Sequence, residues 1–580
     1  MVFLWLIGSA VHAQLKDEAS AIAAFIGVDK EELQDSDDYE RMEHFHNHPL
    51  RVNLADESEL QESGLLTGYQ IATLQDYKKN YGDILSLSEL ASIDGFGKDF
   101  AARLEPFISF DSYLLPGAFT NGRCRRNIST RASARNADYY DNDWSAGIKY
   151  RAEREYGMSG SFAISRGIGG KTDGAGNVSY IFKRYHAKVI SGDFNARFGQ
   201  GLALWNGMTM SGLPTVQSFY RRPSGISSSW SFSGSNSFTG MAACGRVGRW
   251  AFSGAIAFPG IKSSFRSKSP VALLPFVNVS WYGRKVQMSF TDYVMVTPSA
   301  GKTVVDDMKS SLDVRWCISG TDVFSEVAFD WTGRTVAALA GTILPIRENF
   351  KAAAMLRIYP EDFTSVYSGA PRTSGKCSNE YGLSLACEYN DLRQSLSVSA
   401  DAACFPSSLP DPSAYSFQLK PNILWKTKLS GPLSMEMKFS GRYRNRSEPS
   451  FKTELRTDLD ISFGHFIASS RLHLLYFMNF SFLSYVECGY IRDRISLYLR
   501  QGIFRADKWD DRIYAYERDA PGSFNVPAYY GRGVWAAFYM SWRLSGWGKL
   551  YFRTSMTAYP FMEEKKPGKA ELKLQLNITL

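Results

Sequence analysis

From about residue 115 to the C-terminus, apolar and polar residues alternate with a period of two, and this pattern constrains the fold more than any other feature. In the last ten residues, Leu572, Leu574, Leu576, Ile578 and Leu580 alternate with charged, amide and hydroxyl side chains. Similar alternation recurs at 312–318, 435–440, 534–543 and 549–556. Successive side chains of a strand point to opposite faces of a sheet, so each segment has one apolar and one polar face.

Half-buried strands of this kind occur in soluble sandwiches and in membrane-spanning barrels. A secretion-like N-terminus, aromatic residues near segment ends (14% of the chain) and a C-terminus that ends on a strand favour the barrel. The mean hydropathy of −0.23 excludes a polytopic helical membrane protein. We therefore predict a mainly β protein, with a transmembrane antiparallel β-barrel over residues 115–580 that contacts outer-membrane lipid. At roughly 20 to 25 residues per strand and connection, the barrel would have about 18–22 strands.

The first thirteen residues have the composition of a secretory signal peptide. An apolar run, Val2 to Ile7, is followed by small residues, with Val11 and Ala13 placed before Gln14 as a signal peptidase requires. The run lacks a preceding Lys or Arg, and a short buried helix is the alternative. We predict a signal peptide at residues 1–13, and export agrees with a barrel in the outer membrane.

Residues 14–110 have helical rather than strand patterning. Residues 14–49 are acidic, with apolar residues at helical spacing and Pro49 at the end, which predicts a helix and a linker. In residues 50–110, Asp56 with Glu59 and Ser86 with Glu89 have the N-cap and N3 pattern that begins a helix. We predict a small all-α domain at residues 50–110, ahead of the barrel.

Charge divides the chain at the same place. Residues 1–109 contain eight Lys and Arg against twenty Asp and Glu, a net charge of −12. The remaining residues contain 58 basic and 38 acidic side chains, a net charge of +20. Opposite charges on two parts of one chain favour association of these parts in a defined orientation. The alternative is that the basic residues lie in extracellular loops that face the phosphates of lipopolysaccharide.

Two short segments of the small domain resemble the helix-hairpin-helix domain of bacterial competence DNA receptors (ComEA type). The first hairpin is Gly64-Leu65-Leu66, in which Leu66 replaces the expected second glycine, and the second hairpin is Gly95-Phe96-Gly97-Lys98. This resemblance implies a phosphate or DNA contact at the second hairpin, where glycines expose backbone amides and the next helix begins. The alternative is a helix pair used only for packing. Residues 50–109 contain five basic and ten acidic side chains, which disfavours strong DNA binding.

The remainder of the chain resembles the helix-hairpin-helix outer-membrane proteins of the Bacteroidota. The segments that carry this resemblance are Gly192-Asp193-Phe194, Phe198-Gly199-Gln200-Gly201-Leu202, Leu356-Arg357-Ile358-Tyr359-Pro360, Asn379-Glu380-Tyr381-Gly382 and Tyr514-Ala515-Tyr516-Glu517-Arg518-Asp519-Ala520-Pro521-Gly522. The resemblance implies a barrel in the outer membrane with the helix-hairpin-helix domain on its periplasmic side.

The function predicted from these features is non-enzymatic. We expect transport or docking, with an anionic ligand and a periplasmic protein as candidate partners. DNA binding or uptake through the hairpins is the first alternative, and a barrel enzyme acting on lipid or surface polymer is the second. The sequence has neither a Gly-x-Ser-x-Gly nor a His-Glu-x-x-His motif, and we predict no catalytic residues, cofactor or metal.

Overall fold

A computed structural model describes residues 18–580 except for several short segments. The segments left out are 34–36, 113–123, 138–139, 155–156, 208–212, 230, 233–236, 263–270, 300–301, 319, 365, 392, 407–415, 446–448 and 565. The predicted signal peptide at residues 1–13 lies outside the described residues.

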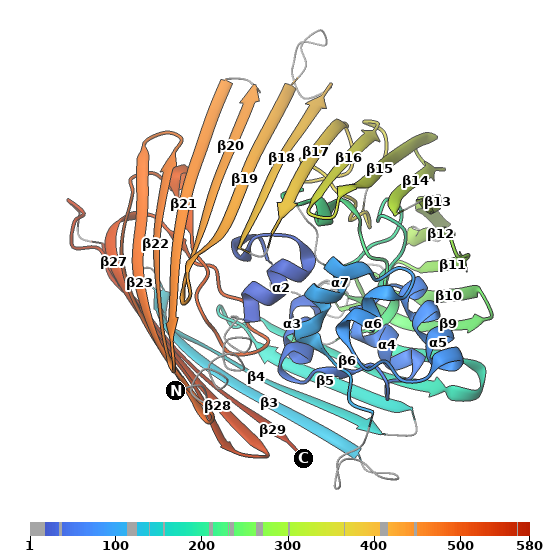
Figure 1. Cartoon of the computed structure of the whole chain (residues 1–580), viewed down its shortest axis with the longest axis horizontal. Coiled ribbons are helices and arrows are strands. Elements are labelled where there is room, and N and C mark those ends of the chain that lie inside the picture. Colours follow the sequence, from blue (N-terminus) through green and yellow to red (C-terminus); the bar gives the residue numbers. More distant parts are fainter. Residues whose placement is uncertain are drawn as a thin grey trace.

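Most of the chain forms one closed antiparallel barrel (Figure 1). Its strands are β3 (Cys124–Ala137), β4 (Tyr140–Arg154), β5 (Met158–Arg166), β6 (Thr172–Phe182), β7 (Ala187–Arg197), β9 (Phe238–Val247), β10 (Trp250–Ala257), β11 (Leu274–Tyr282), β12 (Val286–Ser299), β13 (Lys302–Ile318), β14 (Thr321–Asp330), β15 (Thr335–Arg347), β16 (Phe350–Tyr359), β17 (Glu380–Asn390), β18 (Gln394–Phe405), β19 (Ser416–Ser430), β20 (Leu433–Asn445), β21 (Pro449–Phe463), β22 (Phe466–Tyr476), β23 (Phe480–Arg492), β24 (Ile495–Ala506), β27 (Gly531–Ser545), β28 (Gly548–Ala558) and β29 (Lys569–Thr579). The last strand pairs with the first, from Ala570↔Asn136 to Thr579↔Asn127, and this closes the barrel.

The predicted barrel is confirmed, but the predicted strand number is too low. Within the described part of the chain, 24 strands form the closed wall, rather than about 18–22. Residues 124–579 are 456 positions, and 456 divided by 24 gives 19 residues for each strand with its connection. The number of residues per strand and connection is small because many connections at one end of the barrel are tight turns. The alternation of apolar and polar residues does not show where these turns lie.

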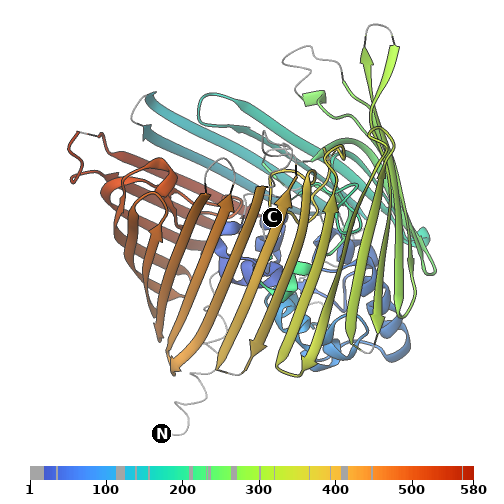
Figure 2. The same cartoon turned by 90° about the horizontal axis from the view of Figure 1, so that it is seen from above.

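The two ends of the barrel differ in their connections. Turns such as 248–249, 431–432, 464–465 and 493–494 join strands at one end, whereas the long connections 198–237, 360–379 and 507–530 lie at the other. Short turns are typical of the periplasmic end of an outer-membrane barrel and long loops of the extracellular end. Figure 2 shows the tilted strands from the side, with the helices toward the short-turn end.

The predicted two-faced register of the last strand is confirmed. Leu572 and Leu574 are 47% and 45% exposed on the outer face. Lys573 points inward and pairs with Asp519 at 2.5 Å, and Gln575 donates to the carbonyl oxygen of Pro521 at 2.7 Å. The outer face is therefore apolar where it meets lipid, and the inner face is polar.

Leu574→Arg is expected to destabilise the barrel by about 2–4 kcal/mol, because it places a guanidinium on the lipid face at the middle of β29. Gln575→Ser should cost about 1 kcal/mol or less, because it removes one inward hydrogen bond. The measurement is a denaturant titration of the protein folded into lipid vesicles. Equal destabilisation by the two substitutions would contradict the assignment of Leu574 to the lipid face and Gln575 to the lumen.

The helical domain, defined here as residues 18–112, precedes the barrel. Its elements are α2 (Glu18–Ile26), η1 (Lys30–Glu32), α3 (Asp37–Asn47), β1 (Leu50–Arg51), α4 (Glu57–Ser63), α5 (Gly68–Tyr81), α6 (Leu87–Ser92), α7 (Gly97–Leu104), η2 (Glu105–Phe107) and β2 (Ile108–Ser109). No helix among the described residues is long and apolar enough to cross a membrane.

Both predicted helix starts in this domain are present. The backbone N–H of Glu59 donates to Asp56 Oδ1 at 3.0 Å, and that of Glu89 donates to Ser86 Oγ at 3.2 Å. The core of this domain includes residues on both sides of the predicted boundary at residue 49. Ala19, Ile22 and Phe25 of α2 are buried in one cluster with the apolar residues of α4 to α7.

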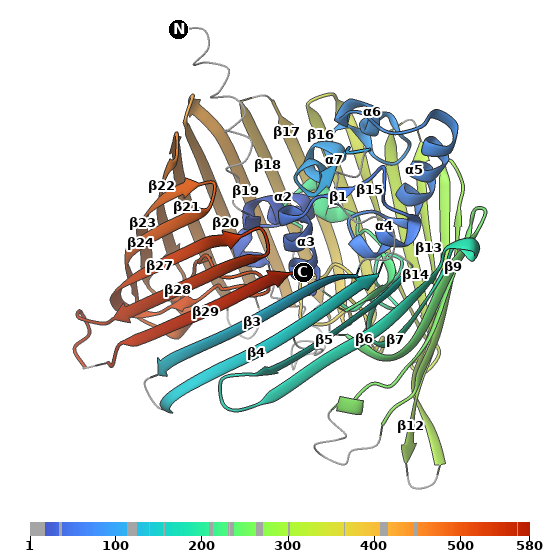
Figure 3. The same ribbon diagram turned by 90° about the horizontal axis from the view of Figure 1, so that it is seen from below.

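The helical domain lies inside the barrel (Figures 1 and 3). The sequence predicts this domain on the periplasmic side, at or in the mouth of the barrel, and leaves open whether it fills the lumen. In the structure it occupies the lumen and reaches the short-turn end, where Tyr69 Oη donates to the carbonyl oxygen of Arg284 in the turn between β11 and β12. The physical reason is the ion pairing described below, which a domain outside the barrel could not make.

The long connections fold into the lumen from the opposite end. Connection 198–237 contains η4 (Val216–Phe219) and β8 (Gly225–Ser228), and connection 507–530 contains η5 (Trp509–Asp511), β25 (Ile513–Tyr514) and β26 (Ala528–Tyr529). Tyr516, from the second of these, is buried in the core of the helical domain. The lumen is therefore filled by the helical domain and by the inward connections together.

Candidate functional site

The interface between the helical domain and the barrel is made of acidic side chains facing basic ones. The carboxylates come from the helical domain, and the Lys and Arg side chains come from strands spread around the wall. The pairs are Asp29 with Lys438 and Arg456, Glu31 with Arg456 and Arg471, Asp38 with Arg197, Glu40 with Lys149, Glu57 with Arg246, Glu62 with Lys188, and Asp99 with Lys351. The charge division in the sequence thus corresponds to a physical contact.

The most connected part of this interface surrounds η1, near the middle of β20 to β22. Asp29 Oδ2 lies 2.6 Å from both Lys438 Nζ and Arg456 Nη1. Glu31 lies 2.8 Å from Arg456 Nη1 and also pairs with Arg471. Burial opposes the ionisation of Asp29, but Arg456 and Lys438 outweigh it and hold the pKa of Asp29 well below its usual range. We expect this cluster to fix the position of the domain in the lumen.

A second group of contacts joins α3 to the wall and to an inward connection. Asp38 pairs with Arg197 at 2.5 Å, and Glu40 pairs with Lys149 at 2.5 Å. Arg41, which is only 1% exposed, donates to the carbonyl oxygen of Ser228 at 2.7 Å. The helix is therefore held by residues on two sides.

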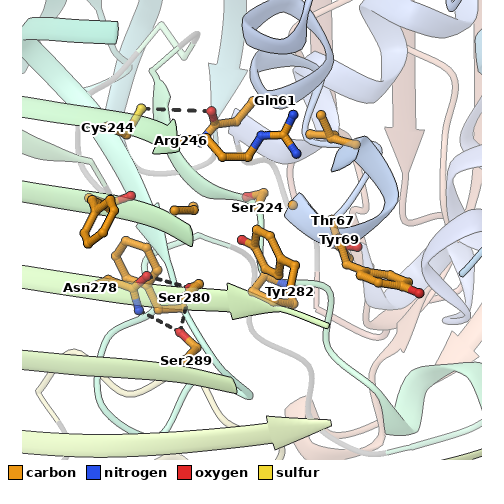
Figure 4. Close-up of a pocket in the computed structure, with 18 of the residues that line it drawn as sticks. Gln61, Thr67, Tyr69, Ser224, Cys244, Arg246, Asn278, Ser280, Tyr282 and Ser289 are labelled. Atoms are coloured by element: carbon orange, nitrogen blue, oxygen red, sulfur yellow. Dashed lines mark hydrogen bonds between the residues drawn. The ribbon is translucent and has the colours of Figure 1, made fainter. Parts of the chain in front are cut away.

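A small cavity of about 80 Å³ lies in the interface near the short-turn end, between α4, α5 and strands β9 to β12 (Figure 4). Arg246 pairs with Glu57 at 2.6 Å beside it, and the thiol of Cys244 points to Gln61 at 3.9 Å. Tyr282 lines the cavity, and its ring lies against the backbone of Gly68. This volume holds only a few water molecules, so we assign no ligand to it.

The two predicted hairpins differ in how far their residues are exposed. In the first hairpin, Leu65 and Leu66 are 1% and 2% exposed and belong to the core of the helical domain. Gly64 has φ +64° and faces the side chain of Arg41. This turn packs against Arg41 of α3, and Gly64 is half-buried.

The second hairpin lies beside a larger cavity, here called the hairpin cavity. Gly95 and Gly97 have φ of +89° and +68°, a conformation that favours glycine. Phe96 is buried, whereas Gly97 and Lys98 are exposed. The structure places Gly95, Phe96, Gly97 and Lys98 together at this cavity, whose volume is about 310 Å³. Its other walls include the 216–222 part of connection 198–237 and strands β13 to β16.

Buried ion pairs at Arg357 and Glu380 hold one of the inward connections in place. Arg357 donates to Glu380 at 3.2 Å and to Asp401 at 2.7 Å. Glu380 accepts the backbone N–H groups of Thr373 and Ser374, at 2.9 and 3.0 Å, from connection 360–379. This network is buried and fixes the connection against the wall.

Connection 507–530 is fixed in the same way. Glu517 accepts from Arg553 at 2.5 Å and from the hydroxyl of Tyr529, while Asp519 pairs with Lys573 at 2.5 Å. The backbone N–H of Gly522 donates to Glu43 of α3 at 2.7 Å. The same connection thus contacts both the wall and the helical domain.

The barrel residues that pair with the helical domain were not identified from the sequence. The sequence shows an excess of Lys and Arg after residue 110. Composition alone does not show which of these residues face the lumen and which lie in extracellular loops. In the described part of the chain, no cluster of three His, Cys, Asp or Glu side chains is arranged to hold a metal ion.

No protein-family model and no curated protein matches the sequence. Among solved structures, the siderophore receptor PirA from Pseudomonas aeruginosa has a TM-score of 0.39 at 8% identity, over 79% of this chain and 80% of that chain. The copper transporter OprC has a TM-score of 0.41 at 8% identity, over 80% and 82%. The FrpB iron transporter from Neisseria meningitidis has a TM-score of 0.35 at 9% identity, over 78% and 81%.

The class of the protein follows from its own features. The closed wall of antiparallel strands, the apolar outer face and the contrast between short and long connections are those of an integral outer-membrane β-barrel. The lumen of this barrel contains an N-terminal helical domain.

Proposed function

We propose that this protein is a gated outer-membrane transporter in which the helical domain, of helix-hairpin-helix type, acts as a removable plug. The observation that carries the proposal is the ring of ion pairs between the acidic domain and the basic wall. A purely structural filling would be expected to use apolar contacts, because replacing buried ion pairs with apolar residues is often neutral or stabilising. Ion pairs can be exchanged for water or for other anions when the domain moves.

Electrical conductance of the full-length protein in planar bilayers tests this proposal. Wild-type protein should conduct little. The double substitution Asp29→Arg with Glu31→Arg brings new guanidinium groups against Lys438, Arg456 and Arg471. It should weaken seating of the domain by about 3–5 kcal/mol, a factor of at least about 100 in the equilibrium, and conductance should rise.

The matched control is Asp76→Arg, which reverses an exposed acidic residue of α5. It should leave conductance at the wild-type level. If the double variant folds and inserts but conducts no more than this control, the plug proposal is wrong.

DNA binding through the second hairpin is the alternative function. Gly95 and Gly97 have the required backbone conformation, but the excess of acidic residues in the domain opposes several simultaneous phosphate contacts. We expect the full-length protein to show no gel shift with duplex DNA near physiological salt. A shift at micromolar protein that disappears in Lys98→Glu would instead favour DNA handling.

A further inference from the structure

The hairpin cavity has more positive than negative charge on its walls. Its cationic lining residues are Lys98, Arg103, Arg222, Arg315 and Lys351, and its carboxylates are Asp99 and Asp322. Two of the cations have partners: Lys351 pairs with Asp99, and Arg315 pairs with Asp322 at 3.0 Å. Lys98, Arg103 and Arg222 have no ion-pair partner among the residues that the structure describes.

Arg222 contacts a carbonyl oxygen and an aromatic ring rather than a carboxylate. Its Nη2 donates to the carbonyl oxygen of Phe25 at 2.8 Å, and its guanidinium lies over the Phe25 ring at 4.0 Å. Its Nη1 is buried and has no hydrogen-bond partner among the described residues. Burial, together with the positive charge of Arg103, lowers the pKa of Arg222 to about 9.

Arg103 of α7 is in a similar position. Its Nε and Nη1 are buried without a hydrogen-bond partner in the described part of the protein. Burial lowers the pKa of Arg103 to about 10, although the carboxylate of Glu388 opposes the shift. A buried guanidinium with unmade hydrogen bonds is costly unless an anion accepts them, so both residues are arranged to receive one.

The rest of the lining limits the kind of anion. The aromatic rings of Phe25, Phe96, Phe100 and Tyr220 and the side chains of Val216 and Ile343 give the cavity a largely apolar surface around the cations. Ligand pockets typically combine such a surface with a few convergent polar groups, at volumes of about 300–1,000 Å³. A cavity of about 310 Å³ fits a small molecule.

We propose that the hairpin cavity binds a compact organic anion, with a phosphate or carboxylate head between Arg103 and Arg222 and a small apolar or aromatic body against the phenylalanine rings. The inference deepens the proposed transport function and rests on it, because the anion is the expected cargo or trigger. Arg103 belongs to the plug and Arg222 to an inward connection, so a bound anion joins the two. Occupancy is therefore coupled to the position of the helical domain.

Calorimetric titration of the full-length protein in detergent tests this site, with phenyl phosphate and benzoate as probes and inorganic phosphate as the head group alone. Phenyl phosphate should bind more tightly than inorganic phosphate, because only phenyl phosphate contacts the rings. Arg222→Gln and Arg103→Gln should each weaken binding about tenfold, as expected when one charged hydrogen-bonding partner is lost. Lys79→Gln, on the exposed face of α5, is the matched control and should bind as wild type does.

Thermal unfolding without a probe separates loss of a ligand contact from loss of folding. Arg103→Gln removes a buried, unsatisfied charge, so its unfolding temperature should equal or exceed that of wild type.

Undiminished binding by both Gln variants, or no binding of either organic probe by wild type, would overturn the site. The readout is equilibrium binding, which does not depend on conductance. Binding by wild type with no conductance increase in the Asp29 and Glu31 double variant would retain the site and reject the plug.

Discussion

Arg357→Met is expected to destabilise the barrel by about 3–5 kcal/mol, because breaking a buried ion pair leaves uncompensated charge. Arg357, Glu380 and Asp401 are 2%, 0% and 5% exposed, so water cannot replace the guanidinium. The measurement is the thermal unfolding midpoint of the full-length protein, followed by the change in mobility on gels between folded and heated barrel.

Two further variants define the cause of this effect. Arg347→Met removes a cation from the exposed end of β15 and should leave the midpoint unchanged. Arg357→Lys should recover only part of the stability, because an ammonium cannot make the forked bonds of a guanidinium. A midpoint for Arg357→Met equal to that of Arg347→Met would show that the buried network contributes nothing.

Arg553→Met should release connection 507–530 from the lumen. Arg553 bonds to Glu517 at 2.5 Å and to Glu571 at 2.7 Å, and its loss should cost about 3–5 kcal/mol. Trypsin added to intact cells should then cleave at Lys508, Arg512 or Arg518. If reclosing is faster than cleavage, the rate follows the population of the released form and should rise roughly a hundredfold.

The control for this experiment is Arg543→Met, which changes an exposed residue near the short-turn end of β27. It should leave the connection resistant to trypsin. Cleavage of wild type and Arg553→Met at the same rate would mean that the connection is not held by Glu517.

Local patterns in the sequence predict local structure in this protein. The outward Leu574 and inward Lys573 follow from the alternation of side chains along one strand, and the cap of α4 follows from Asp56 and Glu59 three residues apart. The number of strands does not follow, because it depends on turns of two or three residues between segments of similar pattern.

The candidate site depends on contacts between distant parts of the chain. Asp29 meets Arg456 across 427 positions, and the hairpin cavity combines Lys98 with Arg222 and Lys351. Composition predicts that one part of the chain is acidic and the other basic, but not which residues form ion pairs. The sequence analysis singled out the segments that contain Arg357 and Glu517, yet the contacts by which these two residues hold the inward connections are visible only in three dimensions.

The burial of Tyr516 in the core of the helical domain has a consequence for assembly. The domain is made first, but its core includes Tyr516, which is synthesised about four hundred residues after the domain ends at residue 112. Tyr39 also packs against Phe524, with ring centroids 4.9 Å apart. The domain therefore cannot complete its fold before connection 507–530, between strands β24 and β27, has been made, and it must already lie in the lumen when β29 pairs with β3. The barrel must therefore close around a helical domain that has not finished folding. The domain is synthesised first but completes its fold last.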